Sequence, residues 1–214
     1  MDKTSGGAQP DQRRQPLGLR ERKKQETAER IYRTALKLFR ERGYEATTVE
    51  EIAQAAEVAK GTFFNYFPTK DAVLSYLGQR QMRVLDEAMA ATVDFDTWPV
   101  SEQLAFVFDT LAAGIQDERE FVRVVSLEVY RSASAFSDTT SSARQLYELF
   151  VGMVRGGQER GELRATVLAD SMALILIGTY FYTFFAWLEL ENPPALALML
   201  RVHLGLLLQG MKST

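Results

Sequence analysis

The sequence contains no cysteine and only one histidine among its 214 residues. The absence of cysteine excludes disulfides and thiolate metal sites, and it leaves the redox compartment open. His203 stands alone in an apolar stretch, where a packed or interface residue is a better interpretation than a catalytic base. No nucleophile elbow, phosphate loop, metal-ligand spacing or paired-carboxylate pattern occurs either. We therefore expect no enzyme, no cofactor and no bound metal.

The first stretch of the chain, residues 1–20, has no apolar core of signal-peptide length. Residues 171–188 run for eighteen positions without a charge, which is about the lower limit for crossing a bilayer. However, acidic residues flank this run, glycine and hydroxyl residues interrupt it, and no Lys or Arg lies close to its ends to anchor it. A helix buried on most sides fits better than a membrane span. We expect a cytoplasmic protein with no membrane partner.

Charge is unevenly distributed along the chain. Residues 1–70 contain 14 Lys and Arg against 10 Asp and Glu, whereas residues 71–214 contain 11 against 18. A small basic unit joined to a larger acidic one suggests that the first meets a polyanion and the second does not. Hydrophobic residues make up 46% of the sequence, which is enough for a substantial buried core.

Apolar residues recur at three- and four-residue steps through most of the chain, which predicts an all-α fold of about nine helices and no strand. Residues 94–99 are expected to form a loop. The expected helices cover approximately residues 22–42, 47–56, 59–67, 71–89, 101–116, 118–131, 140–160, 167–190 and 194–210.

The first two helix boundaries have specific signals. Gly43 stands where a glycine typically ends a helix. Thr47 with Glu50 makes a capping box for the next helix, and Thr48 with Glu51 offers the same arrangement one residue later. Three short helices within about fifty residues, the second and third joined by a tight turn, describe a helix-turn-helix unit.

The sequence of this unit contains a recognisable pattern of residues. Residues 47–53 read TTVEEIA and residues 58–70 read VAKGTFFNYFPTK, after ALKLF at residues 35–39. These segments closely resemble the DNA-binding segment of TetR-family regulators. The resemblance is strong over residues 25–75, and beyond them it rests on total length, the all-helical pattern and two long apolar helices near the end.

The resemblance implies a three-part organisation and a function. A flexible basic arm at residues 1–20 precedes a helix-turn-helix DNA-binding domain at residues 21–70, and residues 71–214 form an effector-binding and dimerisation domain. The implied protein is a ligand-responsive, dimeric repressor that binds a pseudo-palindromic operator in double-stranded DNA. A largely apolar or aromatic small molecule would release it by shifting the fourth helix. An activator is an alternative.

The short third helix offers DNA a compact polar surface. Gly61 lets a base edge or the backbone approach closely, Asn65 could pair with adenine, and Phe64 or the Thr62 methyl could touch a thymine methyl. The other expected contacts are to phosphates. The DNA-contacting residues expected are Thr47, Thr48, Lys60, Gly61, Thr62, Phe64, Asn65, Tyr66 and Lys70.

Each of these residues also has a plainer interpretation. The two threonines could serve only as helix caps, the two lysines could be ordinary solvated charges, and Phe64 could belong to the core. The basic residues near the N-terminus could follow phosphates or enter a minor groove, or they could be a solubilising tail. Those residues are Arg13, Arg14, Arg20, Arg22, Lys23 and Lys24.

Three positions depart from the family pattern. Glu57 stands where the turn usually has glycine, and it would need an unfavourable backbone angle if the turn requires a positive φ. Ala59 stands where serine is frequent, so the third helix loses a side-chain cap. Phe64 replaces a commoner tyrosine. These departures leave open a helical small-molecule-binding dimer whose DNA binding is altered or lost.

The larger domain is expected to supply both a dimer interface and an effector pocket. The last two helices are too apolar for one exposed face each, so burial on two sides is expected. The interface residues expected are Leu174, Ile177, Phe181, Phe185, Leu188, Leu196, Leu200, Leu204 and Leu207. Aromatic residues could line an apolar pocket, although a plain core is the alternative. The pocket residues expected are Phe106, Phe121, Glu128, Tyr130, Tyr147, Phe150, Tyr180 and Phe184.

Overall fold

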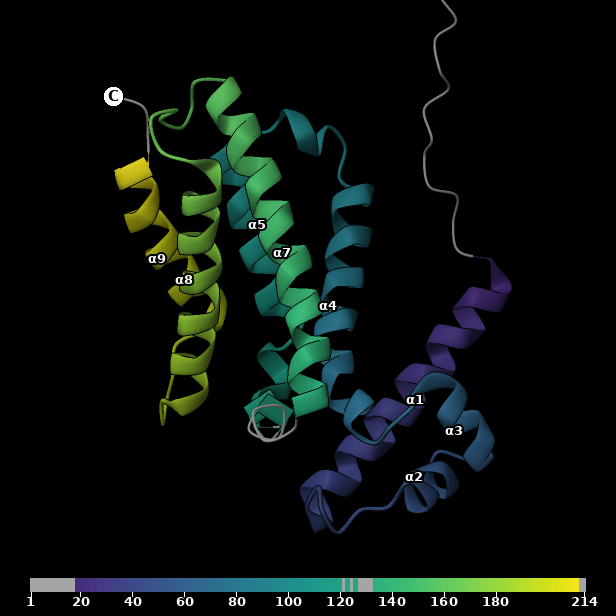
Figure 1. Ribbon diagram of the computed structural model, residues 1–214. Coiled ribbons are helices and arrows are strands. Elements are labelled where there is room, and N and C mark those ends of the chain that lie inside the picture. Colours follow the sequence, from purple (N-terminus) through teal and green to yellow (C-terminus); the bar gives the residue numbers. More distant parts are fainter. Residues whose placement is uncertain (1–17, 121, 124, 127–132, 212–214) are drawn as a thin grey trace, which may run out of the picture.

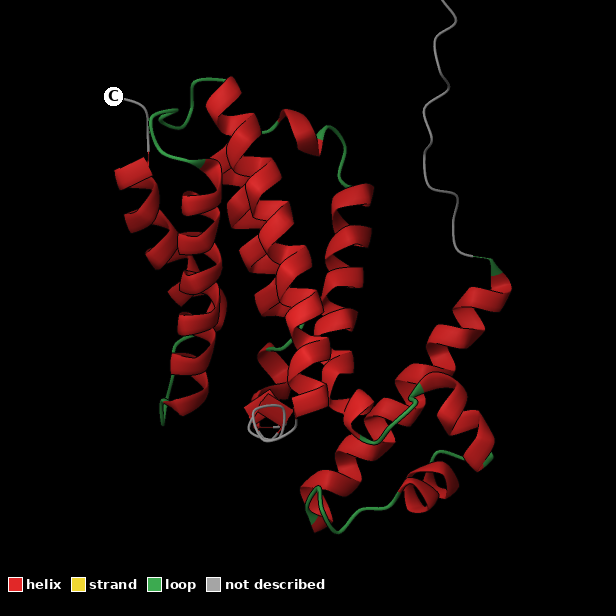
Figure 2. Ribbon diagram, in the orientation of Figure 1, coloured by secondary structure: helices red, strands yellow, loops and turns green. Residues whose placement is uncertain are grey.

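The computed structural model describes residues 18–120, 122–123, 125–126 and 133–211 (Figure 1). Within these ranges the chain is helical and has no strand (Figure 2), so the predicted all-α class is confirmed. Most of the predicted basic arm, residues 1–17, lies outside the described residues, as does part of the helix predicted at 118–131.

Eight α-helices have both ends within the described residues, together with two short 3-10 helices, η1 and η2. Their bounds are α1 Leu19–Arg42, α2 Val49–Ala55, α3 Lys60–Tyr66, α4 Asp71–Ala91, η1 Phe95–Thr97, α5 Val100–Ala113, η2 Gln116–Glu118, α7 Ala133–Glu159, α8 Ala169–Glu189 and α9 Leu196–Met211.

The structure differs from the predictions at the start of one helix and in one loop. Helix α7 begins at Ala133, seven residues before the predicted start. The sequence of its first turns is ASAFSDTT, which has one large apolar residue and therefore no apolar stripe. The loop predicted at residues 94–99 contains η1, which brings Phe95 into the core with 8% of its surface exposed.

Helices α1, α2 and α3 form a small unit at one end of the molecule (Figure 1). The buried residues of α1 recur every three or four positions and form one apolar stripe, and the helix packs on α2 and α4. Ile31, Ile52 and Phe63, one from each helix, are all fully buried. Each such side chain contributes roughly 1.5–3 kcal/mol by leaving water, so this shared core fixes the three helices relative to one another.

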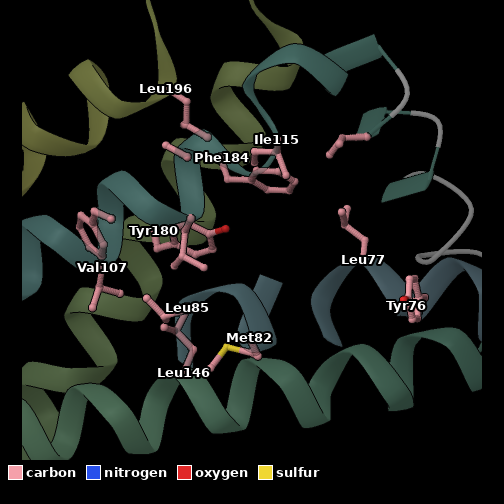
Figure 3. Packing of buried hydrophobic residues seen from close by; sticks show 14 of the residues in the cluster. Tyr76, Leu77, Met82, Leu85, Val107, Ile115, Leu146, Tyr180, Phe184 and Leu196 are labelled. Carbon is pink, nitrogen blue, oxygen red and sulfur yellow. The ribbon is translucent and has the colours of Figure 1, made fainter. Parts of the chain in front are cut away.

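Helix α4 leads from this unit into a larger helical domain. It packs along α7, α7 packs on α8, and α5 and α8 both pack on α9. Side chains from four of these helices meet in the core, where Figure 3 shows Leu85, Val107, Leu146 and Tyr180 together. The start of α4 at Asp71, as predicted, makes this helix the covalent connection between the two units.

Helix α8 contains the charge-free run noted in the sequence. By length and composition it could cross a membrane, and 44% of its most apolar stretch is buried within the fold of the chain. It lies between α7 and α9, and Trp187 and Leu188 near its end are buried in the same core as Leu176. Packing on two neighbouring helices therefore accounts for part of its apolar character.

Candidate nucleic-acid interface

The connection between α1 and α2 is fixed by backbone geometry and one helix cap. Gly43 has a φ of 86° and donates its amide to the Phe39 carbonyl at 2.9 Å, so the predicted glycine stop is confirmed. The Thr48 hydroxyl accepts the Glu51 amide at 3.2 Å, and the Glu51 carboxylate accepts the Thr48 amide at 2.8 Å. Helix α2 thus starts with a capping box made by this pair.

The alternative box between Thr47 and Glu50 is wrong. Helix α2 begins at Val49, so the capping position belongs to Thr48. Thr47 instead points inward with 1% of its surface exposed and donates its hydroxyl to the Gly43 carbonyl at 2.8 Å. Its side chain therefore offers no free surface to a phosphate.

The turn between α2 and α3 requires the backbone angle anticipated from the sequence. Glu57 has a φ of 54°, a left-handed conformation that costs a residue with a side chain about 1–2 kcal/mol. The turn is nevertheless closed, because the next amide, of Val58, donates to the Ala53 carbonyl at 2.9 Å. Ala59 occupies the position before α3 and makes no side-chain cap, also as predicted.

Helix α3 has a buried inner face and an exposed outer face. Phe63 and Phe67 are 0% and 2% exposed, and they anchor the helix to the core. Phe64 is 41% exposed, with its ring edge-on to Phe63 at 5.6 Å, so it belongs to the surface. Lys60, Gly61 and Asn65 are also exposed, whereas Thr62 and Tyr66 are half-buried.

The first turn of α3 is open to a ligand. No atom outside its immediate neighbours lies within 4 Å of the place where a Gly61 Cβ would stand. Lys60 and Phe64 flank it, with the Lys60 ammonium 5.9 Å from the centre of the Phe64 ring. A backbone that can be approached this closely, beside a cation and an aromatic face, suits the edge of a base pair or a phosphate.

A contact that the sequence did not reveal joins the first turns of α2 and α3. The Lys60 ammonium forms an ion pair with the Glu50 carboxylate, and both side chains are more than half exposed. The hydrogen bond from Lys60 lowers the pKa of Glu50 below its usual value. The sequence does contain a signal for this ion pair. If Thr48 and Glu51 form the cap, Glu50 is left free to face α3.

Lys70 is held inside the small unit. Its ammonium donates to the carbonyls of Tyr44 and Thr47 at 2.9 and 3.1 Å and lies 4.1 Å from the centre of the Tyr44 ring. The Tyr44 hydroxyl in turn donates to the Asp71 carboxylate. The sequence placed Lys70 at a phosphate and gave Tyr44 no role, whereas the structure uses this pair to join the α1–α2 turn to the start of α4.

The residues predicted to line an effector pocket fall into separate groups. Phe150 and Tyr180 are buried beside Phe108, with ring centres at 5.7 and 6.2 Å from it, and Phe184 stacks on Tyr180 at 6.2 Å. Figure 3 shows Tyr180 and Phe184 in the same buried cluster as Ile115. Phe121, Glu128 and Tyr130 lie outside the residues whose side chains are described.

Two predicted pocket residues lie away from this cluster. Phe106 packs on Phe95 and Trp98, at 5.3 and 5.9 Å between ring centres. Tyr147 is partly exposed and donates its hydroxyl to Asp170 at 3.0 Å. A hollow of about 900 Å³ opens where α4, η1 and α7 meet, and none of the predicted pocket residues whose side chains are described lines it.

Helices α8 and α9 share an exposed apolar face, which the sequence placed only in part. Leu174 is 61% exposed, while Ile177, Phe181, Phe185 and Leu207 are half-buried. Four other predicted interface residues belong to the core of the chain's own fold: Leu188, Leu196, Leu200 and Leu204. Five exposed residues on the same two helices were not predicted: Ile175, Tyr182, Leu198, Val202 and Leu206. Both faces of these helices are apolar, so periodicity alone could not tell which one packs internally.

Sequence comparison identifies relatives of the small unit and of the whole chain. The family model of the bacterial regulatory proteins of the tetR family matches residues 31–77. The regulator TcmR of Streptomyces glaucescens is 43% identical over 77 residues, but the match covers only about a third of each chain, 36% here and 32% of TcmR. The repressor DhaR of a Mycobacterium species is 27% identical over 67% of this chain and 73% of its own.

A solved structure resembles most of the chain. The FadR repressor of Thermus thermophilus, determined in complex with lauroyl-CoA, is 32% identical, and the comparison covers 87% of this chain and 96% of that one with a TM-score of 0.62. The helix-turn-helix geometry and the arrangement of the longer helices thus recur together in one relative. The chain belongs to the TetR family of bacterial transcriptional regulators.

Proposed function

We propose that this regulator is a homodimeric repressor that binds a pseudo-palindromic site in duplex DNA and is released by a largely apolar acyl ligand. The observation that carries the proposal is the outer surface of α3, where Lys60, Gly61, Phe64 and Asn65 are all exposed on a helix anchored by Phe63. This surface combines a cation, an accessible backbone, an aromatic face and an amide, which are the groups that read a major groove.

The structure modifies the set of proposed DNA contacts. Thr48, at the exposed start of α2, is retained as a phosphate contact, since helix N-termini attract anions. Thr47 and Lys70 support the contact surface from behind, because one is buried and the other donates to two carbonyls. The strained Glu57 does not prevent α3 from forming, which favours a working DNA-binding unit over one that has lost its function.

Dimerisation is supported by the apolar face of α8 and α9. Leu174, Tyr182, Val202 and Leu206 are each more than half exposed, and they lie on two helices that pack on each other. Several exposed large apolar side chains on neighbouring helices favour a protein interface. A two-fold related pair would place two α3 helices on one side of the assembly. Two such helices require two half-sites about one helical turn of DNA apart.

The proposed ligand is a fatty-acyl thioester, an acyl-CoA. The T. thermophilus FadR structure contains lauroyl-CoA, and that protein is 32% identical over 96% of its length. The core of this chain offers the apolar surroundings that an acyl tail needs, with Phe108, Phe150, Tyr180 and Phe184 packed together. Polar groups are also present there, since the Tyr180 hydroxyl donates to Gln81 at 3.4 Å. A cytoplasmic location follows from this function, because both the DNA and acyl-CoA are found there.

Selection from a library of random duplexes tests DNA binding directly. The wild-type protein is expected to enrich an inverted repeat, and a Lys60→Ala, Tyr66→Ala double variant is expected not to enrich it. Lauroyl-CoA added to the complex should then release the selected duplex, whereas free coenzyme A should not. A transcription assay with the selected site upstream or downstream of a promoter separates repression from activation. Failure to enrich any duplex would overturn the repressor function and leave a helical ligand-binding dimer.

A further inference from the structure

A short polar segment after α5 contacts three different helices of the molecule, α4, α8 and α9. It consists of η2 and the next residue, Arg119, and it follows the last turn of α5 closely in sequence. Gln116, Glu118 and Arg119 each hold a different element through their side chains. None of them was singled out by the sequence pattern, because polar residues in a break between helices look like an ordinary loop.

Glu118 reaches toward the DNA-binding unit. Its carboxylate accepts a hydrogen bond from Arg80 of α4 at 3.2 Å. The same guanidinium lies 3.7 Å from the carboxylate of Glu29, which belongs to α1. Arg80 is 19% exposed, Glu29 25% and Glu118 33%, so water screens this network less than a surface pair. One planar guanidinium therefore joins α1, α4 and η2.

The other two side chains reach toward α8 and α9. Arg119 donates to the carbonyls of Trp187 at 3.1 Å and of Leu188 at 2.9 Å, and it also donates to the Leu190 carbonyl. Trp187 and Leu188 lie in the last turn of α8 and Leu190 directly follows it, and carbonyls at such a helix end lack partners within the helix and favour a nearby cation. The side-chain oxygen of Gln116 accepts the amide of Leu196, the first residue of α9, at 3.0 Å.

We propose that Glu118 and Arg80 are positioning residues for DNA binding. Together with Gln116 and Arg119 they fix the angle of the α1–α3 unit relative to α8 and α9, and this angle sets the spacing of the two α3 helices in a dimer. The link from this angle to the spacing of the two α3 helices rests on the proposed function, since it requires that α8 and α9 form the dimer interface. The angle within one protomer does not depend on the function.

The contacts between α1 and α4 explain why this network can control the orientation of the DNA-binding unit. The apolar contact between α1 and α4 includes the rings of Tyr32 and Tyr76, whose centres lie 4.9 Å apart. A ring contact of this kind tolerates a change of angle between two helices, because apolar attraction has little directionality. The Arg80 guanidinium donates a directional hydrogen bond to Glu118 and is attracted by charge to the Glu29 carboxylate at 3.7 Å, so it favours one angle among those that the rings allow. Loss of either carboxylate leaves the angle less well determined.

The first test measures the angle within a protomer and needs no DNA. Because the chain has no cysteine, Gln54→Cys on α2 and Glu102→Cys on α5 introduce two labelling sites at exposed positions. Spin labels on these sites, in protein diluted with unlabelled chains, report one intramolecular distance. Glu118→Ala and Arg80→Met are expected to broaden or shift the distance distribution. An unchanged distribution in both variants would overturn the proposal.

A matched control removes an ion pair that does not reach the DNA-binding unit. Asp109 of α5 accepts two hydrogen bonds from Arg201 of α9, at 2.8 and 2.6 Å. Asp109→Asn weakens this pair within the helical domain, and the label distance should stay as in the wild type. A shift in this variant equal to that of Glu118→Ala would also overturn the proposal, because it would assign the effect to general loosening.

The second test uses the duplex enriched by the wild-type protein. Glu29→Ala, Arg80→Met and Glu118→Ala should each weaken its binding, by roughly tenfold, a size typical of coupling between sites. The triple variant should lose little more than Arg80→Met alone, because the three residues act as one unit. Additive losses, or losses that only follow the thermal unfolding midpoint, would contradict the positioning role. If no duplex is enriched, the proposed function fails, while the label distance still decides the positioning of the unit.

Discussion

The carboxylate of Glu50, in the first turn of α2, is ion-paired with the ammonium of Lys60, in the first turn of α3. This pair places a negative charge beside the one cation that α3 contributes to the proposed DNA surface. The acid and the phosphates of DNA then compete for the same ammonium. Glu50 is thus expected to moderate the affinity of the surface for phosphate.

Replacement of Glu50 by Gln should strengthen binding to duplex DNA. The variant frees Lys60 and removes a charge that repels phosphate, and an exposed pair of this kind corresponds to about a twofold to fivefold change in affinity. Fluorescence anisotropy at fixed salt would measure it. Glu45→Gln is the control, since it makes the same change of charge in the same unit at an exposed position. Equal gains in the two variants would mean that only net charge matters.

Replacement of Glu57 by Gly should stabilise the protein. Glycine removes the cost of a φ of 54°, about 1–2 kcal/mol, but it loses roughly 0.5–1 kcal/mol of backbone entropy on folding. The expected net gain is about 0.5–1 kcal/mol in the free energy of unfolding, measured by urea denaturation. Glu57→Ala keeps the strained angle and should bring no gain. A gain in the alanine variant of the same size would show that the glutamate side chain, and not φ, is unfavourable.

Thr48→Ala should destabilise α2 through loss of its cap. The Thr48 hydroxyl accepts the Glu51 amide, and replacement of such a threonine costs about 1 kcal/mol. Thr48→Ser retains the hydroxyl and should remain close to the wild type in urea denaturation. Thr47→Ala tests the assignment of the cap. The Thr47 hydroxyl bonds to the Gly43 carbonyl and not to an amide of α2, so this variant shows the effect of losing a threonine hydroxyl that is not the cap. A Thr48→Ala protein as stable as the wild type would contradict the capping box.

The same box predicts a dependence on pH. Hydrogen bonds from the amide and then the hydroxyl of Thr48 lower the pKa of Glu51 below its usual 4.5. A lowered pKa means that the carboxylate stabilises the fold above pH 4.5, and that this contribution is lost as the pH falls through the lower value in the folded protein. Glu51→Ala should therefore be less stable than the wild type at pH 7, and the difference in thermal midpoint should narrow below pH 4.5. A constant difference would argue against this origin.

Leu174→Glu should prevent dimerisation. Leu174 is 61% exposed on α8, and a glutamate there would be buried without a partner in the proposed interface. Sedimentation should show a dimer for the wild type and a dissociation constant at least about 30-fold higher for the variant. Val93→Glu, at a 79% exposed site after α4, should leave the dimer intact. If Leu174→Glu sediments as the wild type does, the dimer uses another face.

Local signals in the sequence predicted the small unit well. The glycine stop at Gly43, the strained turn at Glu57, the uncapped Ala59 and the inward Phe63 all depend on near neighbours, and each is confirmed. The partners of Lys60 and Lys70 were missed. Both of those contacts join residues from different elements, which periodicity cannot pair.

The larger domain was harder to predict because its helices are apolar on more than one side. Leu196 and Leu200 face the protomer core, whereas Leu198 and Val202 between and after them face outward. An alternation of leucine and valine gives no sign of which face packs on α5 and α8. The polar segment at Gln116 likewise has no periodicity that predicts its contacts. Its partners on α4, α8 and α9 are distant in sequence and come close to it only in the folded chain.

The affinity of the protein for its selected duplex and for a random duplex, over a range of salt concentrations, tests the central claim most directly. Tight binding of the selected duplex should weaken linearly with salt on logarithmic axes. Asn65→Ala should lose the preference for that duplex, by about 1–3 kcal/mol, and keep the salt slope. Lys60→Ala should weaken both duplexes and reduce the slope by about one. A wild-type protein that binds both duplexes equally at every salt concentration would contradict the assignment of α3 as the helix that reads DNA.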